Sequence, residues 1–323
     1  MELQSYILKR IVGLLPTLVL ITLTTFLIIK IAPGDPILMF MDTMEADQAD
    51  DLERLRERMG LNDPLHIQYW RWMTDFFSGN FGHSIAARRP VLELIIERFP
   101  ATLLLTMSSL LFSLIVSIPV GVISAVKQYS ALDNVVTTVA FFGIAMPNFW
   151  LGLLMIWMFS IFLGILPSGG MGTIGVESGW PTIVDTARHL VMPMVVLGTA
   201  SMAGFTRYMR SSVLEVLRED YIRTARAKGL SERVVLYKHA LKNAFIPIAT
   251  LLGFQLRQFV SGSLITEQIF AWPGLGWYTW HSVNRRDYPV MMGILTFAAL
   301  LTLVGNLLAD ISYAFLDPQI RYN

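Results

Sequence analysis

Apolar residues in this chain form long runs separated by polar stretches. Six runs approach or exceed the 20 or so residues that cross a hydrocarbon layer about 30 Å thick. They lie at residues 11–31, 101–126, 135–163, 190–205, 244–266 and 289–315. Pro147 lies inside the third run and Pro193 near the start of the fourth, where each is a candidate kink or a tolerated proline. The pattern predicts an all-α polytopic membrane protein with six transmembrane helices.

Composition supports this class. Of 323 residues, 54% are hydrophobic and 15% are charged, whereas charged residues approach a quarter of a soluble domain. The net charge of +1 offers no basic field for nucleic acid. The absence of cysteine excludes disulfides and thiol chemistry. We expect no metal site, because the histidines are scattered without a ligand spacing: His66, His83, His189, His239 and His281.

The positions of Lys and Arg predict the orientation in the membrane. Lys9 and Arg10 precede the first run, Lys127 follows the second, and Arg321 lies in the C-terminal tail. The loop between the fourth and fifth runs carries nine basic and four acidic residues. With six spans these segments share one side, so both termini and this loop are expected to be cytoplasmic. The first run begins like a signal peptide but is longer than one, and we expect a retained helix.

We expect a single membrane domain over residues 1–323. It would comprise an N-terminal helix (1–32), an extracytoplasmic insertion (33–100) and a five-helix core (101–323) that contains the basic loop at 212–247. Within the insertion, the sequence predicts a helix at 47–59 and an aromatic stretch at 67–77 that favours the membrane interface.

The basic loop reads as two helices joined at Gly229. Over residues 212–228, apolar positions recur at helical spacing, and Gly229 suits the left-handed conformation that ends a helix. Ser231 is a candidate N-cap, with Glu232 in the first turn. The positions expected to form the apolar faces are Leu214, Leu217, Tyr221 and Ala225, then Val234, Tyr237 and Leu241. This hairpin suits either anionic lipid or a cytoplasmic protein partner.

The loop resembles the coupling motif of ATP-binding-cassette importer permeases of the oligopeptide/dipeptide branch. The resemblance rests on Thr224-Ala-Arg-Ala-Lys-Gly-Leu230 and on His239-Ala-Leu-Lys-Asn243, with Pro247 following. The general consensus of the coupling motif differs at two places. It has Glu-Ala at the two positions before Ala225, and it has proline at the position of Lys242. Six further segments resemble signatures of this branch, in order: Ala32-Pro-Gly-Asp-Pro36, Arg56-x-x-Met59-Gly-Leu-Asn-Asp-Pro64-Leu65, Gly79-Asn-Phe-Gly-His-Ser84, Pro147-Asn-Phe-Trp150, Glu267-x-Ile-Phe-x-Trp-Pro-Gly-Leu-Gly276 and Asp317-Pro-x-x-Arg321.

The resemblance implies the type I importer permease fold with a cytoplasmic coupling helix between helices four and five. It implies that an ATPase is contacted by Tyr221, Arg223, Thr224, Ala225, Arg226, Lys228, Gly229, Leu230 and Arg233. The implied partners are a second permease, two ATPase subunits that bind ATP and Mg, and an extracytoplasmic substrate-binding protein. The chain lacks a phosphate-binding Walker A motif, so we expect no enzyme activity and no cofactor of its own.

The implied substrates are peptides, with nickel chelates, glutathione and oligosaccharides as alternatives. Ionisable groups at membrane depth usually face a cavity or pair internally, so we predict that a translocation path is lined by Gln255, Arg257, Gln258 and Glu267. Arg257 would meet a substrate carboxylate or, alternatively, pair with Glu267, Asp310 or an acid on the second permease.

The apolar segment at residues 267–280, which contains Trp272, Pro273 and Gly274, is predicted to be too broken for a helix. It suits either a re-entrant stretch near the outer mouth or an aromatic anchor. Two alternatives of other classes are an ion-coupled secondary transporter and a lipid-bound scaffold. The first would predict inverted repeats, and no convincing pair is present.

Overall fold

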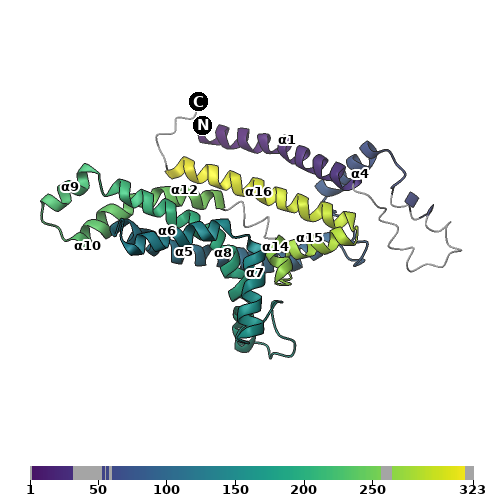
Figure 1. Cartoon of the computed structure of the whole chain (residues 1–323). Helices are drawn as coiled ribbons and strands as arrows, with labels where there is room; N and C mark the ends of the chain where they lie inside the picture. The colour runs from purple at the N-terminus through teal and green to yellow at the C-terminus, as the bar shows by residue number, and fades with distance from the viewer. Residues whose placement is uncertain (1, 32–52, 55, 58–59, 256–263, 317–323) are drawn as a thin grey trace. The chain divides into compact units, whose positions relative to one another are not determined.

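The computed structural model of the chain describes residues 2–31, 53–54, 56–57, 60–255 and 264–316. Apart from one isolated bridge between His83 and Pro90, the regular elements in these ranges are helices (Figure 1). The chain divides into two compact units. The first comprises Met1–Pro100 and Gly274–Asn323, and the second comprises Ala101–Pro273.

The first unit is built on two long helices that lie side by side, α1 (Glu2–Ile31) and α16 (Tyr288–Leu316). Leu18 of α1 packs with Ala299 and Leu303 of α16. The unit also contains α4 (Leu65–Phe77), the first turns of α5 (Val91–Val126) and α15 (Leu275–Asn284), which packs against α16.

Helix α4 covers the aromatic stretch that was expected to seek the membrane interface. Met73 and Phe76 are instead buried in the cluster formed with α1 and α16. Trp70 and Phe77, at the edge of this buried side, remain exposed. An amphipathic helix buries the stripe that recurs every three to four residues, so half of the aromatic stretch belongs to the core of the unit. Most of the helix predicted at 47–59 lies outside the described residues.

The second unit contains most of α5 and the helices that follow it. These are α6 (Ala131–Ala145), α7 (Asn148–Met155), the π-helix η1 (Ile156–Phe162), α8 (Trp180–Val216), α9 (Asp220–Ala227), α10 (Glu232–Val234), the π-helix η2 (Val235–Ala240), α11 (Leu241–Ala244), α12 (Ile246–Gln255) and α14 (Leu264–Ile269).

Helices α5 and α8 approach each other closely at two glycines. A Cβ on Gly121 would lie 2.8 Å from both the Cβ of Met209 and the carbonyl oxygen of Thr206. A Cβ on Gly198 would lie 2.8 Å from the ring of Phe112. Small residues at such crossings allow backbones to approach, which is the usual basis of helix packing in membranes.

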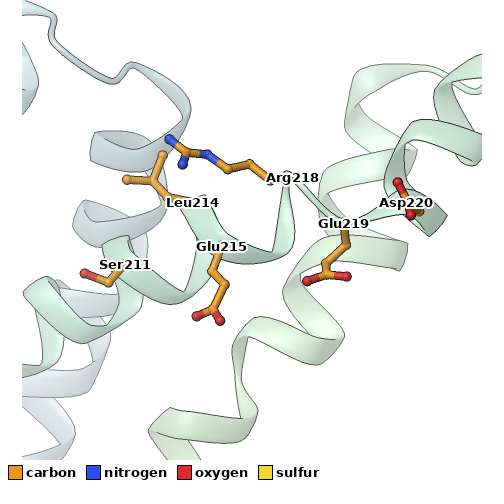
Figure 2. Close-up of a pocket in the computed structure, with 6 residues that line it drawn as sticks. All are labelled: Ser211, Leu214, Glu215, Arg218, Glu219 and Asp220. Carbon is orange, nitrogen blue, oxygen red and sulfur yellow. The ribbon is translucent and has the colours of Figure 1, made fainter.

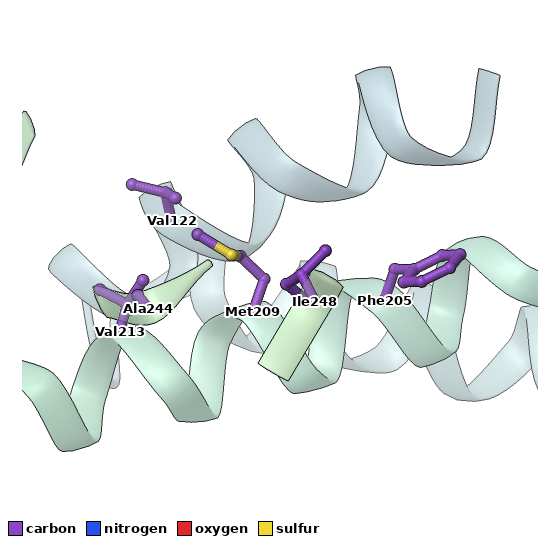
Figure 3. Close-up of a cluster of buried hydrophobic side chains, with 7 residues drawn as sticks. Val122, Phe205, Met209, Val213, Ala244 and Ile248 are labelled. Atoms are coloured by element: carbon purple, nitrogen blue, oxygen red, sulfur yellow. The ribbon is translucent and has the colours of Figure 1, made fainter. Parts of the chain in front are cut away.

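Near the α9 end of α8, these two helices enclose a hydrophobic core together with α11 and α12 (Figure 3). The cluster consists of Val122, Ala125, Phe205, Met209, Val213, Ala244 and Ile248. The hydroxyl of Ser212 donates a hydrogen bond to the carbonyl oxygen of Ala244 at 3.0 Å. The end of α8 is therefore fixed against the start of the next predicted span.

Four helices of the described chain are long and apolar enough to cross a membrane: Val12–Ile31, Val91–Val126, Trp180–Val216 and Tyr288–Leu307. They correspond to the first, second, fourth and sixth predicted spans. The third predicted span is broken at Pro147, which lies between α6 and α7 in extended conformation. The fifth includes residues 256–263, which lie outside the described residues.

Candidate coupling site

The polypeptide leaves α8 at Val216 and begins α9 at Asp220, after a break at residues 217–219. The prediction of one continuous helix over 212–228 was therefore wrong. The apolar spacing was misleading because a tertiary contact decides which side of each segment is buried. Ile222 is fully buried, whereas Tyr221, which the periodicity assigned to the apolar face, is 40% exposed.

Helix α9 is held by a small hydrophobic cluster of its own. Ile222 and Ala225 pack against Val235 and Ala240 of η2, with Val216 and Leu217 at the edge. We call this cluster the seat of α9. The amide side chain of Asn243 also donates a hydrogen bond to the Tyr221 hydroxyl at 2.7 Å. Because so short a helix is not stable alone, α9 depends on these contacts for its position.

The second half of the loop is helical but not one regular helix. The π-helix η2 interrupts it at Val235–Ala240, and one extra residue in a turn shifts the side chains that follow. As a result Val235, Ala240 and Ala244 are buried, while the predicted core residue Tyr237 is 68% exposed. Ser231 has the extended backbone of an N-cap but makes no capping hydrogen bond through its side chain.

The corner at Gly229 is confirmed. Its φ of +75° lies in the left-handed region, and its N–H donates to the carbonyl oxygen of Arg226 at 2.9 Å. Across the corner, the guanidinium of Arg226 makes two hydrogen bonds, of 2.9 and 3.2 Å, to the Glu232 carboxylate. The corner therefore has a defined shape although nearly all of its side chains are exposed.

The exposed face of this corner carries most of the predicted contact residues. Among the nine, Ala225 is buried at 6% exposure and contributes to the seat of α9. The other eight are exposed: Tyr221, Arg223, Thr224, Arg226, Lys228, Gly229, Leu230 and Arg233. Arg223 pairs with Asp220 at 3.0 Å, whereas Lys228 and Arg233 have no ion pair within the described residues.

A hollow of about 520 Å³ lies where α8 ends and α9 begins. Figure 2 shows the carboxylates of Glu215 and Glu219 pointing to the same side, with Arg218 extending away from them. Ser211, Leu214 and Asp220 complete the lining. The site thus combines an acidic recess with a basic corner, so a partner of mixed charge would fit it.

Asp133, which no sequence motif had singled out, fixes α8 to the α5–α6 hairpin. Arg210 of α8 donates two hydrogen bonds of 2.8 Å to its carboxylate. The Ser124 hydroxyl at the end of α5 and the backbone N–H of Tyr129, at 2.9 Å, also donate to it. The spacing Ser130-x-x-Asp133, a helix-start signature in which the Ser130 side chain accepts from the Asp133 N–H, was the available signal.

The Asp133 carboxylate is charged over the whole physiological range. Its side chain is 2% exposed, which on its own would favour the neutral form. The hydrogen bonds from Arg210, together with those from Ser124 and Tyr129, outweigh this burial and hold the pKa of Asp133 well below its usual value. The group lies in α6, two residues before the predicted third span. Because its partners Ser124 and Arg210 lie at the ends of α5 and α8, it joins three helices at the base of the coupling loop.

The predicted path residues are only partly described. Arg257 and Gln258 lie outside the described residues, and the Gln255 side chain does too. Glu267 is fully buried in α14 and accepts a hydrogen bond from the Thr102 hydroxyl at 2.9 Å. The role of these residues in a translocation path stays a prediction.

Trp272 also lies in the interior of the second unit. Its side chain is fully buried, and its indole N–H donates to the carbonyl oxygen of Ala101 at 2.8 Å. The residues around Pro273 and Gly274 are non-helical, but α14 extends to Ile269 and α15 begins at Leu275. The break is therefore shorter than the predicted segment at 267–280. Its position at an outer mouth stays a prediction. No group of three metal-binding side chains occurs among the residues that the structure describes.

Comparison with known proteins identifies the family. Residues 117–322 match the family described as "Binding-protein-dependent transport system inner membrane component". Residues 3–106 match the description of the corresponding N-terminal region. The chain belongs to this family. It is therefore a multi-pass inner-membrane permease of the importer class that its coupling motif resembles, and importers of this class work with ATPase and substrate-binding partners.

Relatives of this permease match over nearly its whole length. It is 48% identical to the oligopeptide transport system permease protein AppB of Bacillus subtilis, over 98% of this chain and 99% of that protein. It is 40% identical to a dipeptide transport system permease protein, DppB of Alkalihalophilus pseudofirmus, and 41% identical to a glutathione transport system permease protein, GsiC of Salmonella paratyphi A. Each of these two alignments also covers 98% of this chain and 99% of the relative.

A solved structure shows the same fold at lower identity. A chain of the inward-facing MetNI methionine ABC transporter superposes with a TM-score of 0.56 at 19% identity. The match covers 70% of this permease and 97% of that chain. The type I importer permease fold predicted from sequence is confirmed.

Proposed function

We propose that this permease forms half of a path through which an ATP-driven importer moves peptides across the bacterial cytoplasmic membrane. The observation that carries the proposal is the corner at Gly229. It presents a set of exposed residues on a short helix whose other side is anchored to the ends of the membrane helices. Such an element can transmit a push from a partner, because its buried contacts hold its shape.

The proposed partners are a homologous second permease, two cytoplasmic ATPase subunits and an extracytoplasmic substrate-binding protein. ATP and Mg would be bound by the ATPase subunits and not by this chain. Both termini and the coupling corner would face the cytoplasm, in line with the distribution of Lys and Arg. The basic side chains around the corner could in addition touch anionic lipid.

Coupling would proceed through the contacts at the base of the loop. When ATP closes the two ATPase subunits, they displace α9, and the seat formed by Ile222 and Ala225 passes the displacement to η2. The ion pair between Asp133 and Arg210 makes the end of α8 move together with the α5–α6 hairpin. The path would open outward in the ATP-bound state and inward after hydrolysis.

Peptides are the proposed substrate class because two of the relatives are named for oligopeptide and dipeptide transport. Glutathione is a second candidate, favoured by the relative named for glutathione transport. Binding measurements on the substrate-binding partner would separate the two. Tight binding of unmodified di- and oligopeptides is expected, and binding of glutathione with no response to ordinary peptides would contradict the peptide assignment.

The ATPase contact can be tested with a Gly229→Asp variant. This change adds a side chain and a negative charge at the corner and also strains a left-handed backbone position. We expect the variant permease to reach the membrane but to lose copurifying ATPase subunits and transport. Retention of both at wild-type levels would contradict the proposed contact.

Gly164 supplies a matched control for this experiment. It also has a left-handed backbone, with φ of +63°, and a Cβ there meets nothing within 4 Å, as at Gly229. It follows the third predicted span and so is expected on the opposite side of the membrane. A Gly164→Asp variant therefore carries the same strain and charge but should retain the ATPase subunits.

Arg257 is proposed to meet the substrate carboxylate, on the basis of its place in an apolar stretch. An Arg257→Ala variant with wild-type protein levels should raise the KM for peptides with a free carboxylate more than for C-terminally amidated peptides. Unchanged kinetics for every peptide would exclude a role in the path and favour a structural ion pair.

A further inference from the structure

A basic pocket lies within the first unit, at the N-terminal end of α5. It has a volume of about 270 Å³ and is formed by the loop at residues 86–89, the first turns of α5, and α15 with the residues just after it. Nothing in the coupling mechanism uses this pocket.

Arg98 is the central cation of the pocket. Its guanidinium carbon lies 5.3 Å from the ring centre of Trp277 and 5.0 Å from that of Tyr278. These two cation–π contacts fix the side chain, but they satisfy none of its N–H donors. The Nε atom is buried and has no hydrogen-bond partner within the described residues. A buried donor without an acceptor is costly, so a ligand that supplies an acceptor would be stabilised here.

The pocket has more positive charge than its own residues neutralise. Arg89 and Arg285 line it together with Arg98. Arg89 pairs with Glu97 at 3.0 Å, but neither Arg98 nor Arg285 has an ion pair among the described residues. The ligand that fits a pocket lined by these two guanidinium groups is therefore an anion, and a planar carboxylate matches the geometry of a guanidinium group best.

Asp287 is the acidic residue in the pocket lining, and it is already engaged. Its side chain is 2% exposed. Its carboxylate accepts hydrogen bonds from the Ser84 hydroxyl at 2.5 Å and from the backbone N–H groups of Ile85 and Ala86 at 3.1 Å each. Asp287 thus holds the loop that shapes the pocket, and it leaves Arg98 and Arg285 to an outside carboxylate.

The predicted orientation of the chain indicates which side of the membrane the pocket faces. The pocket residues lie in two segments, 33–100 between the first and second predicted spans and 267–288 between the fifth and sixth. With six spans and the basic loop at 212–247 in the cytoplasm, both segments are expected on the outer side. The pocket is therefore expected to face away from the ATPase side.

We propose that this pocket receives an Asp or Glu side chain of the extracytoplasmic substrate-binding protein when that protein docks. The inference rests on the proposed function, which places the ATPase on the cytoplasmic side of the membrane. The family description requires a binding protein, and the uncompensated Arg98 and Arg285 give that partner a complementary charge to supply. Arg98 and Arg285 are thus docking residues for an acidic partner surface.

The test uses the complete importer in lipid nanodiscs and measures the Kd of the purified binding protein by biolayer interferometry. Arg98→Gln and Arg285→Gln should each weaken binding by about tenfold and reduce its salt dependence. Arg88→Gln is the matched control, because it removes the same charge from the loop at residues 86–89, at an exposed residue that is not part of the pocket lining. It should bind as the wild type does.

The outcomes distinguish a failure of the docking proposal from a failure of the proposed function. Copurifying ATPase subunits report on the function independently of docking, and every variant should retain them. Unchanged Kd values for both pocket variants would overturn the proposal. An unchanged Kd with a raised KM for peptide import would also overturn it, because the carboxylate would then belong to the substrate. If Arg98→Gln fails to assemble, the exposed Arg285 decides the question.

Discussion

Asp133 and Arg210 form a two-point ion pair, 77 residues apart in the chain, with both N–O distances at 2.8 Å. The carboxylate is almost fully buried, and the Arg210 side chain is a quarter exposed. Because Ser124 donates to the same carboxylate, the pair joins the end of α5, the start of α6 and the end of α8. These helices meet at the base of the coupling loop.

Removing one partner of this pair should destabilise the permease strongly. An Arg210→Ala variant leaves a buried carboxylate without its counter-ion. The expected loss in the free energy of unfolding is about 3 kcal/mol, near the lower end of the range for buried pairs, because Arg210 is partly exposed. We expect a large fall in the Tm of the detergent-solubilised importer. The double variant Asp133→Ala/Arg210→Ala should lose less than the sum of the two single losses, and strict additivity would contradict a direct interaction.

The contribution of this pair should not depend on pH near neutrality. The folded state holds the pKa of Asp133 below its unfolded value of about 3.9. The stabilisation is therefore fully present above that unfolded value and is lost as the pH falls towards the folded value. The Tm difference between wild type and Asp133→Asn should be constant between about pH 5 and 8. A difference that shrinks on going from pH 8 to pH 6 would contradict this assignment.

The crossing of α5 and α8 should not accept a side chain at Gly121. A Gly121→Ala variant places a methyl group 2.8 Å from the Met209 Cβ and the Thr206 carbonyl oxygen, and such overpacking costs about 1–3 kcal/mol. At Gly204 of α8, an added methyl group would meet nothing within 4 Å, so Gly204→Ala should be neutral or stabilising by about 0.5–1 kcal/mol. Equal effects on Tm would show that the two helices are not so closely packed.

The coupling helix should depend on its buried side. Ile222→Ala removes a fully buried side chain from the seat of α9 and should cost about 2–5 kcal/mol locally, loosening the ATPase contact. Val234→Ala shortens a 38% exposed side chain in the same loop and should have little effect. The measurement is ATP hydrolysis per peptide transported, which should rise for Ile222→Ala alone. An unchanged ratio would mean that the seat does not transmit movement.

The sequence predicted the elements whose signals are local. Apolar runs predicted the long helices α1, α5, α8 and α16. Gly229 marked a turn with a left-handed backbone conformation, which glycine adopts more easily than other residues. The faces of the coupling loop were predicted wrongly, because the break before Asp220 and the π-helix η2 shift the register, and neither is visible in a periodicity. Pairing of Asp133 with Arg210 depends on helix packing, so the sequence showed at most the capping pattern at Ser130.

The proposed ATPase contact is tested most directly by cross-linking from the corner. The chain contains no cysteine, so Thr224→Cys introduces a single attachment point on the exposed side of α9. A benzophenone maleimide attached there, in the assembled importer, should yield a covalent adduct with the ATPase subunit upon illumination. The cysteine-free wild type and an Ile174→Cys variant, whose side chain is fully exposed beyond the third predicted span, should yield none. Absence of an ATPase adduct from position 224, with the complex intact, would contradict the proposed contact between α9 and the ATPase.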